Sequence, residues 1–323
     1  MKLLVLADLH LGASLAAWGS QAAAARDDLA RAWDEAVELA LDARDGIDGL
    51  LVAGDLFDAP EPPAEILDAV DRGLGRLVSA GKQVVLLPGI YDGLVSPRSV
   101  YHRKSWPSGV LVVDWSRPRI ATIRRGEETL LLFTFAPLPL AGQPPFAPPE
   151  RKPEDGAEYR VGLFHAVPGA ESPLVSWGCR PDPDALAELC LDLLVMGGDH
   201  RGREAIWGRT RVLSPGSPVP LRPQDHEETA WTVVTLSGRN VVLERRPRGS
   251  TLDPAREIPA DESARGSALG SAGQDRPPVG GLRAALLRVY EERLGTGEDR
   301  ALLESALRYG LEKIDRPEAC HVD

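Results

Sequence analysis

Cysteine is scarce in this sequence of 323 residues. The three cysteines, Cys179, Cys190 and Cys320, are odd in number, and no two of them form a C-x-x-C pair. This pattern excludes a disulfide scaffold and a cysteine-type structural zinc site, and it is typical of a reducing compartment. Long apolar runs are missing too, since no stretch approaches 18 residues and Asp8 and His10 interrupt the apolar start. We therefore expect a cytoplasmic protein with no membrane segment.

Basic residues are also fewer than acidic ones. The chain has 37 Lys and Arg against 48 Asp and Glu, a formal net charge of −11. Because non-specific DNA binding depends on cations that neutralise phosphates, this balance gives DNA only weak support as a partner. The sequence has no G-x-S-x-G elbow, no P-loop and no G-x-G-x-x-G after a strand. Their absence argues against a serine hydrolase of the α/β type, a P-loop nucleoside triphosphatase and a dinucleotide-binding dehydrogenase, respectively.

Apolar runs and helical patterns alternate in the first part of the chain. Runs at 2–7, 49–53 and 83–87 are separated by helical patterns at about 21–43 and 60–80. Strands that are apolar on both faces and alternate with helices predict a parallel sheet, with a crevice at the carboxyl ends of its strands. From about residue 110 the runs become short, which predicts a second sheet packed on the first. The expected fold is α/β, with two packed mixed sheets flanked by helices.

The last part of the chain differs in composition. Residues 247–281 contain eleven Gly or Pro and show no periodicity, which indicates a flexible linker after a domain at 1–246. Two amphipathic patterns follow, and they predict a helical pair at 282–316. The pair could fold back on the domain or dock on a partner.

Metal-ligating residue types follow the apolar runs. Asp8 and His10 are two residues apart at the end of the first run, and a period of two would place both side chains on one face. Further acidic and imidazole groups follow the later apolar runs, at the same carboxyl edge of the predicted sheet. They lie in the segments Gly54–Asp58, Pro88–Gly93 and Gly197–His200 and at His165. Asp58, Asp92 and Asp199 could equally cap turns.

The ordered series of motifs resembles the calcineurin-like metallophosphoesterases, and within them the SbcD-like nucleases that process DNA double-strand breaks. The resemblance covers residues 1–245 and rests on D-L-H-L-G at 8–12, G-D-x-x-D at 54–58, P-G-x-x-D at 88–92, His165, G-x-x-H at 197–200 and S-P-G-S-P at 214–218. It implies a two-metal site, commonly manganese, with Asp8, His10 and His200 on the first metal and Asp55 bridging to a second metal held also by His165.

Three positions depart from the family pattern. Ile90 stands where the resemblance implies an asparagine and Gly198 where it implies a histidine, so the second metal loses two ligands. The candidate catalytic residues are Tyr91 and Asp92. Tyr91 stands where the resemblance implies a proton-donating histidine, and a tyrosine is poorly matched to proton transfer at neutral pH. We therefore expect one divalent ion, most simply Mn²⁺, rather than two, and reduced or lost turnover.

Three functions fit this pattern. The first is an SbcD-like DNA-processing subunit with reduced or lost exonuclease activity, whose residues 282–314 bind a coiled-coil ATPase of the SbcC type, as the resemblance implies. The second is a non-catalytic scaffold for that ATPase. The third is a one-metal phosphodiesterase that acts on a small substrate. A homodimer is compatible with each of them.

Overall fold

The structure is a computed structural model that describes residues 1–89, 91–93, 98–113, 119–134, 157–165, 189–238, 240–250 and 252. Ile90, the predicted helix pair at 282–316 and nearly all of the predicted linker at 247–281 lie outside these residues. Within them, no helix has the length and apolarity that a membrane span requires.

Two six-stranded sheets form the core of the domain. The first has the order β12-β11-β1-β2-β3-β4, and the second has the order β5-β6-β7-β8-β10-β9. The strands of the first sheet are β1 (Lys2–Leu6), β2 (Gly49–Ala53), β3 (Gln83–Leu87), β4 (Val110–Val112), β11 (Ala230–Ser237) and β12 (Asn240–Pro247). Those of the second are β5 (Arg119–Arg125), β6 (Glu128–Thr134), β7 (Tyr159–His165), β8 (Leu193–Gly197), β9 (Arg203–Trp207) and β10 (Thr210–Ser214).

Both sheets are mixed. In the first sheet β1 to β4 run parallel, and β11 pairs antiparallel with both β1 and β12. In the second sheet β6, β7, β8 and β10 run parallel between the antiparallel edge strands β5 and β9. The expected α/β architecture of two packed mixed sheets is therefore confirmed.

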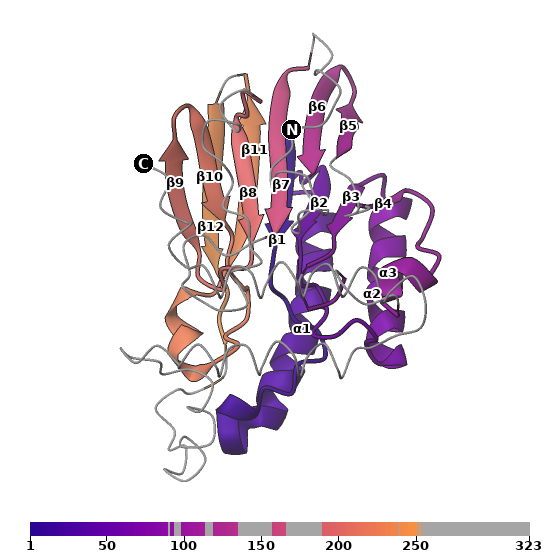
Figure 1. The fold of residues 1–323 in the computed structure, drawn as a ribbon, viewed down its shortest axis with the longest axis vertical. Coiled ribbons are helices and arrows are strands. Elements are labelled where there is room, and N and C mark those ends of the chain that lie inside the picture. The colour runs from indigo at the N-terminus through magenta and orange to yellow at the C-terminus, as the bar shows by residue number, and fades with distance from the viewer. Residues whose placement is uncertain are drawn as a thin grey trace, which may run out of the picture.

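Helices lie against the first sheet (Figure 1). They are α1 (Ala22–Leu41), preceded by the 3₁₀ helix η1 (Ala16–Gln21), then α2 (Ala64–Ser79) and the short α3 (Val100–Arg103); a second 3₁₀ helix, η3 (Pro223–Glu228), precedes β11. Alternate residues of each central strand point to opposite faces. Leu4 and Leu50 pack with α1 and α2, whereas Leu3 and Leu51 pack against the second sheet. This double burial explains why the strand sequences are apolar throughout.

Some details differ from the sequence-based expectation. Strands β4, β11 and β12 were expected in the second sheet but belong to the first, because pairing across distant segments is not encoded in local pattern. Strand β9 was not predicted, since its residues are mostly exposed and show no apolar alternation. Just past the expected boundary at 246, Arg248 and Leu252 are buried.

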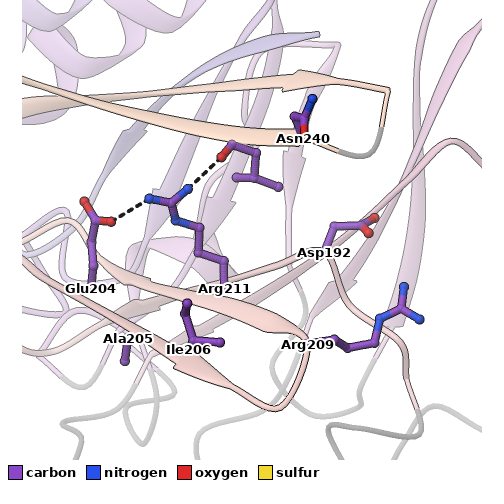
Figure 2. A pocket seen from close by; sticks show the side chains of 8 residues that line it. Asp192, Glu204, Ala205, Ile206, Arg209, Arg211 and Asn240 are labelled. Atoms are coloured by element: carbon purple, nitrogen blue, oxygen red, sulfur yellow. Dashed lines mark hydrogen bonds and ion pairs between the residues drawn. The ribbon is translucent and has the colours of Figure 1, made fainter.

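A groove of about 530 Å³ opens where the two sheets meet at their β9 and β12 edges (Figure 2). Arg211 of β10 joins the sheets there, since its guanidinium donates to the carbonyl of Val241 at 2.7 Å and to Glu204 at 2.9 Å. Asp192, which lines the groove, immediately precedes β8, whereas the predicted site residues follow the opposite end of that strand. The groove is thus separate from the predicted metal site.

Candidate metal centre

The loops after β1 and β2 are joined by backbone hydrogen bonds. Asp8 N–H donates to the carbonyl of Gly54 at 3.1 Å, and His10 N–H donates to that of Asp55 at 3.0 Å. Strand β1 ends at Leu6, so the strand alternation that was expected to align Asp8 with His10 does not apply. The two loops bring Asp8, His10 and Asp55 to one edge of the sheet instead.

Three of these residues have unusual backbone conformations. Asp8, His10 and Asp55 have φ values of 53°, 50° and 49°, in the left-handed region that non-glycine residues rarely adopt. Such conformations cost of order 1–3 kcal/mol each and cluster at functional sites. This strained backbone therefore orients the three side chains toward the candidate site.

The predicted ligands converge in two overlapping groups. The ligand atoms of Asp8, His10 and His200 lie within 4.8 Å of one another, and so do those of Asp8, Asp55 and His165. Asp55 also approaches the first group, since its Oδ2 lies 3.9 Å from His10 Nε2. The resemblance implied that Asp55 is the shared residue, but the structure gives Asp8 a place in both groups.

The donor set fits a divalent cation. His10 Nε2 is buried and forms no hydrogen bond within the described residues, although buried polar atoms nearly always have a partner. Burial and the neighbouring His10 lower the pKa of His200 to about 4, so its imidazole is neutral at pH 7 and can donate a lone pair. Neutral imidazoles beside carboxylates are ligands that Mn²⁺ and Zn²⁺ accept.

Negative charge is partly offset within the second group. Burial alone would lower the pKa of His165, but Asp55 and Asp8 outweigh it and raise that pKa to about 10. Its Nε2 lies 3.0 Å from Asp55 Oδ2, and its Nδ1 lies 2.8 Å from the carbonyl of Ala53. Burial in turn raises the pKa of Asp8 to about 6, while His165 holds that of Asp55 below its usual range despite burial. A protonated His165 thus offsets one of the two carboxylate charges of this group, and a metal ion would have to displace its proton.

Position 198 supplies no side-chain ligand. Gly198, with φ of 99°, instead donates its backbone N–H to both carboxylate oxygens of Asp8, at 3.0 and 2.9 Å. Asp199 also faces away from the ligands, since its carboxylate accepts from Arg201 N–H at 3.1 Å and pairs with Arg203 at 2.9 Å. Asp199 therefore does not replace the histidine that position 198 lacks.

Asp92, which was predicted as a catalytic residue, is buried in the loop after β3. Its carboxylate is fully buried and accepts from the backbone of Gly89 at 2.6 Å and Phe57 at 3.1 Å, and from the hydroxyl of Tyr101 at 3.0 Å. Burial and the charge of Asp55 raise its pKa to about 7. These contacts fix the loop after β3, and the catalytic role of Asp92 stays a prediction.

Tyr91 lies at the site, as expected. Its ring packs edge-on against that of His10, with centroids 4.9 Å apart, and 48% of the residue is exposed. Its backbone N–H donates to Asp55 Oδ1 at 2.8 Å. Burial and the carboxylates of Asp55 and Asp58 raise the pKa of its hydroxyl above 10, so this hydroxyl is neutral at pH 7 and a weak acid.

Sequence reasoning missed the role of Asp58. Its Oδ1 lies 3.1 Å from His10 Nδ1, an arrangement in which an Nδ1–H donates to the carboxylate and leaves Nε2 free toward the ligand cluster. A carboxylate behind a metal-binding histidine commonly fixes the imidazole in this way. The motif G-D-x-x-D at 54–58 did include Asp58, but from the sequence alone a turn-capping role explained this residue equally well.

Replacing Asp58 with alanine is expected to weaken Mn²⁺ binding by about 10- to 100-fold, because His10 loses the partner that orients its ring. Asp58→Asn should weaken it less, since its amide oxygen can still accept from Nδ1–H. Calorimetric titration with MnCl₂ measures both. Asp199→Ala is the matched control and should bind Mn²⁺ as the unaltered protein does; equal affinities for Asp58→Ala and the control would contradict this role.

Together, the fold and the ligand cluster define a metallophosphoesterase. Residues 1–202 match the calcineurin-like phosphoesterase family, and the chain belongs to that family, as its motifs predicted.

Curated relatives are DNA double-strand break repair proteins named Mre11. The protein from Methanopyrus kandleri is 28% identical over 239 residues, 68% of this chain and 49% of that protein. The protein from Aeropyrum pernix is 37% identical over 140 residues, 38% of this chain and 32% of that one, and the protein from Methanosarcina mazei is 24% identical over 76% and 38%. The matched region spans half or less of each relative's length.

The chain also resembles solved structures at low sequence identity. A dimetal phosphatase from Danio rerio is 12% identical, with a TM-score of 0.47 over 77% of this chain and 97% of that one. An archaeal phosphodiesterase is 9% identical, with a TM-score of 0.38 over 76% and 99%.

Proposed function

We propose that this chain is a one-metal phosphodiesterase of the DNA-repair nuclease branch, with turnover below that of a complete two-metal site. The observation that carries the proposal is the convergence of Asp8, His10 and His200 beside a second group that lacks a side-chain ligand at position 198. His10 Nε2 is buried there and forms no hydrogen bond with the residues that the structure describes. Support for a DNA substrate comes from the names of the curated relatives. The acidic net charge predicts weak non-specific DNA binding.

Each residue of the site has a defined part in this proposal. Asp8, His10 and His200 would hold the ion, with Asp55 close enough to join them, and Asp58 would orient His10. A bound divalent ion supplies Lewis acidity toward a phosphoryl oxygen and lowers the pKa of a water molecule. The neutral hydroxyl of Tyr91 can donate a hydrogen bond to substrate, but its raised pKa makes it a poor general acid at pH 7.

Restoring the histidine at position 91 tests this assignment. We expect slow Mn²⁺-dependent hydrolysis of bis-p-nitrophenyl phosphate by the unaltered protein and at least a tenfold higher kcat for Tyr91→His, since a positioned general acid contributes about 10²- to 10⁴-fold. Linear duplex DNA is the second substrate to assay. Tyr91→Phe is the matched control and should not gain activity. Hydrolysis that is absent from both the unaltered protein and Tyr91→His would contradict the phosphodiesterase proposal.

We further propose that residues 282–314 bind a coiled-coil ATPase of the SbcC type. The support is the pair of amphipathic patterns in the sequence, and these residues lie outside those that the structure describes. Full-length protein with Leu286→Glu and Leu307→Glu should lose co-purification with such an ATPase and keep Mn²⁺ binding. Undiminished association would contradict this docking role.

A further inference from the structure

The candidate site has an excess of negative charge for a phosphate ligand. Asp8 and Asp55 are buried within it, and Asp58 lies at its edge with 39% of its side chain exposed. A phosphodiester is itself an anion, and a site with one metal ion offers it less positive charge than a two-metal site. A further cation near the metal centre would offset this repulsion.

Arg222 is held near the site by the segment that follows β10. Ser217 N–H donates to the carbonyl of His200 at 2.9 Å, so this segment is joined directly to a metal ligand. The buried Trp18 donates its indole N–H to the carbonyl of Pro220 at 3.0 Å, and the carbonyl of Arg222 accepts from Asp225 N–H at 3.0 Å. The backbone on both sides of Arg222 is therefore fixed, while the residue itself is exposed.

The guanidinium of Arg222 is available for an anion. Among the residues that the structure describes, no carboxylate forms an ion pair with it, whereas neighbouring Arg203 pairs with Asp199 at 2.9 Å and Arg201 lies 3.9 Å from Asp225. The guanidinium is close enough for its charge to act on Tyr91 and His200, which belong to two different loops of the site. Arg222 is thus an exposed cation near the metal centre, with no carboxylate partner among the described residues.

We propose that Arg222 binds the non-bridging oxygens of the substrate phosphate, in a position to supply part of the positive charge that a second metal ion would provide. The inference rests on the proposed function and assigns its substrate-binding residue. A guanidinium suits this task because its planar fork can donate two parallel hydrogen bonds to a phosphate. Lysine at this position would keep the charge but lose the fork.

The test uses full-length, Mn²⁺-loaded protein and thymidine 5′-monophosphate as the probe, with binding measured by calorimetry. We expect Arg222→Gln to weaken binding at least tenfold and Arg222→Lys to weaken it less, with unchanged Mn²⁺ affinity and Tm in both. In hydrolysis of bis-p-nitrophenyl phosphate, Arg222→Gln should raise KM more than it lowers kcat. The control is Arg209→Gln, which removes an arginine from the separate groove in Figure 2 and should change neither quantity.

The outcomes separate this inference from the proposed function. Binding of the probe that depends on Arg222 without any hydrolysis would support the inference and contradict the function. Hydrolysis with the same KM and probe affinity in Arg222→Gln as in the unaltered protein would support the function and overturn the inference.

Discussion

Asp8→Asn is expected to lower Mn²⁺ affinity by more than about 100-fold. This is more than the usual effect of losing a residue that only orients a metal ligand. Asp8 belongs to both ligand groups, so no other single change removes as much of the centre. An asparagine has one acceptor oxygen in place of two. Its NH₂ group would face either the N–H of Gly198, which now donates to both oxygens, or the ligand cluster.

The same substitution should not unfold the protein. Burial raises the pKa of Asp8 to about 6, above its value in the unfolded chain, so the ionised carboxylate destabilises the metal-free fold at pH 7. A neutral asparagine removes that cost, and the metal-free variant should have a Tm equal to or higher than that of the unaltered protein. Asp34→Asn, on the exposed face of α1, is the control for calorimetric Mn²⁺ titration. Near-normal affinity in Asp8→Asn would show that the ion binds elsewhere.

Replacing Arg248 with methionine is expected to lower the free energy of unfolding by about 3–5 kcal/mol, as removal of one partner from a buried ion pair does. The side chains of Arg248 and Asp28 are each only 2% exposed, and the guanidinium donates to both carboxylate oxygens of Asp28 at 3.0 Å. It also donates to Glu35 at 2.7 Å and lies 5.7 Å from the ring centroid of Trp231. Methionine would leave the charge of Asp28 buried, with only the half-exposed Arg31 at 2.9 Å and the hydroxyl of Ser250 at 3.1 Å to compensate it.

Two further variants separate this effect from lost packing. Asp28→Leu combined with Arg248→Met should recover most of the stability, because the poorly compensated buried charge is then gone. Arg246→Met removes an arginine two residues earlier, whose pairs with Asp45 and Glu244 are more exposed, and it should cost less than about 1 kcal/mol. Urea denaturation measures all three. Equal losses for Arg246→Met and Arg248→Met would contradict the account.

The loss of unfolding free energy caused by Arg248→Met should also depend on pH. Burial raises the pKa of Asp28, but the hydrogen bonds from Arg248 outweigh it, so the folded pKa lies below the unfolded one. Such a group stabilises the fold above the unfolded pKa of about 3.9, and this contribution is lost as the pH falls through the folded pKa. The difference between the variant and the unaltered protein should therefore be full at pH 7 and shrink below about pH 4.

Local sequence pattern predicted much of the fold. The apolar runs that became β1, β2 and β3 are buried on both faces, and this burial needs no long-range information to be recognised. Sheet membership did need it, because β11 pairs with β1 across more than two hundred residues of chain. The ion pair between Asp28 and Arg248 was missed for the same reason, and Arg248 was instead assigned to a flexible linker.

The candidate site was predictable in composition but not in geometry. Motif spacing identified Asp8, His10, Asp55, His165 and His200, and the structure brings all five together. The spacing could not show that left-handed backbone at positions 8, 10 and 55, rather than strand alternation, directs these side chains. It also could not distinguish a turn cap from a ligand partner at Asp58. Nor could it identify Arg222, whose segment is held by hydrogen bonds from Ser217 to His200 and from Trp18 to Pro220.

The number of manganese ions bound per chain tests the central claim most directly. Protein purified without chelator, dialysed against Mn²⁺ and analysed by inductively coupled plasma mass spectrometry should contain close to one ion per chain. Asp8→Asn and His10→Ala should contain almost none. Two tightly bound ions per chain, or one ion that persists in both variants, would contradict the account.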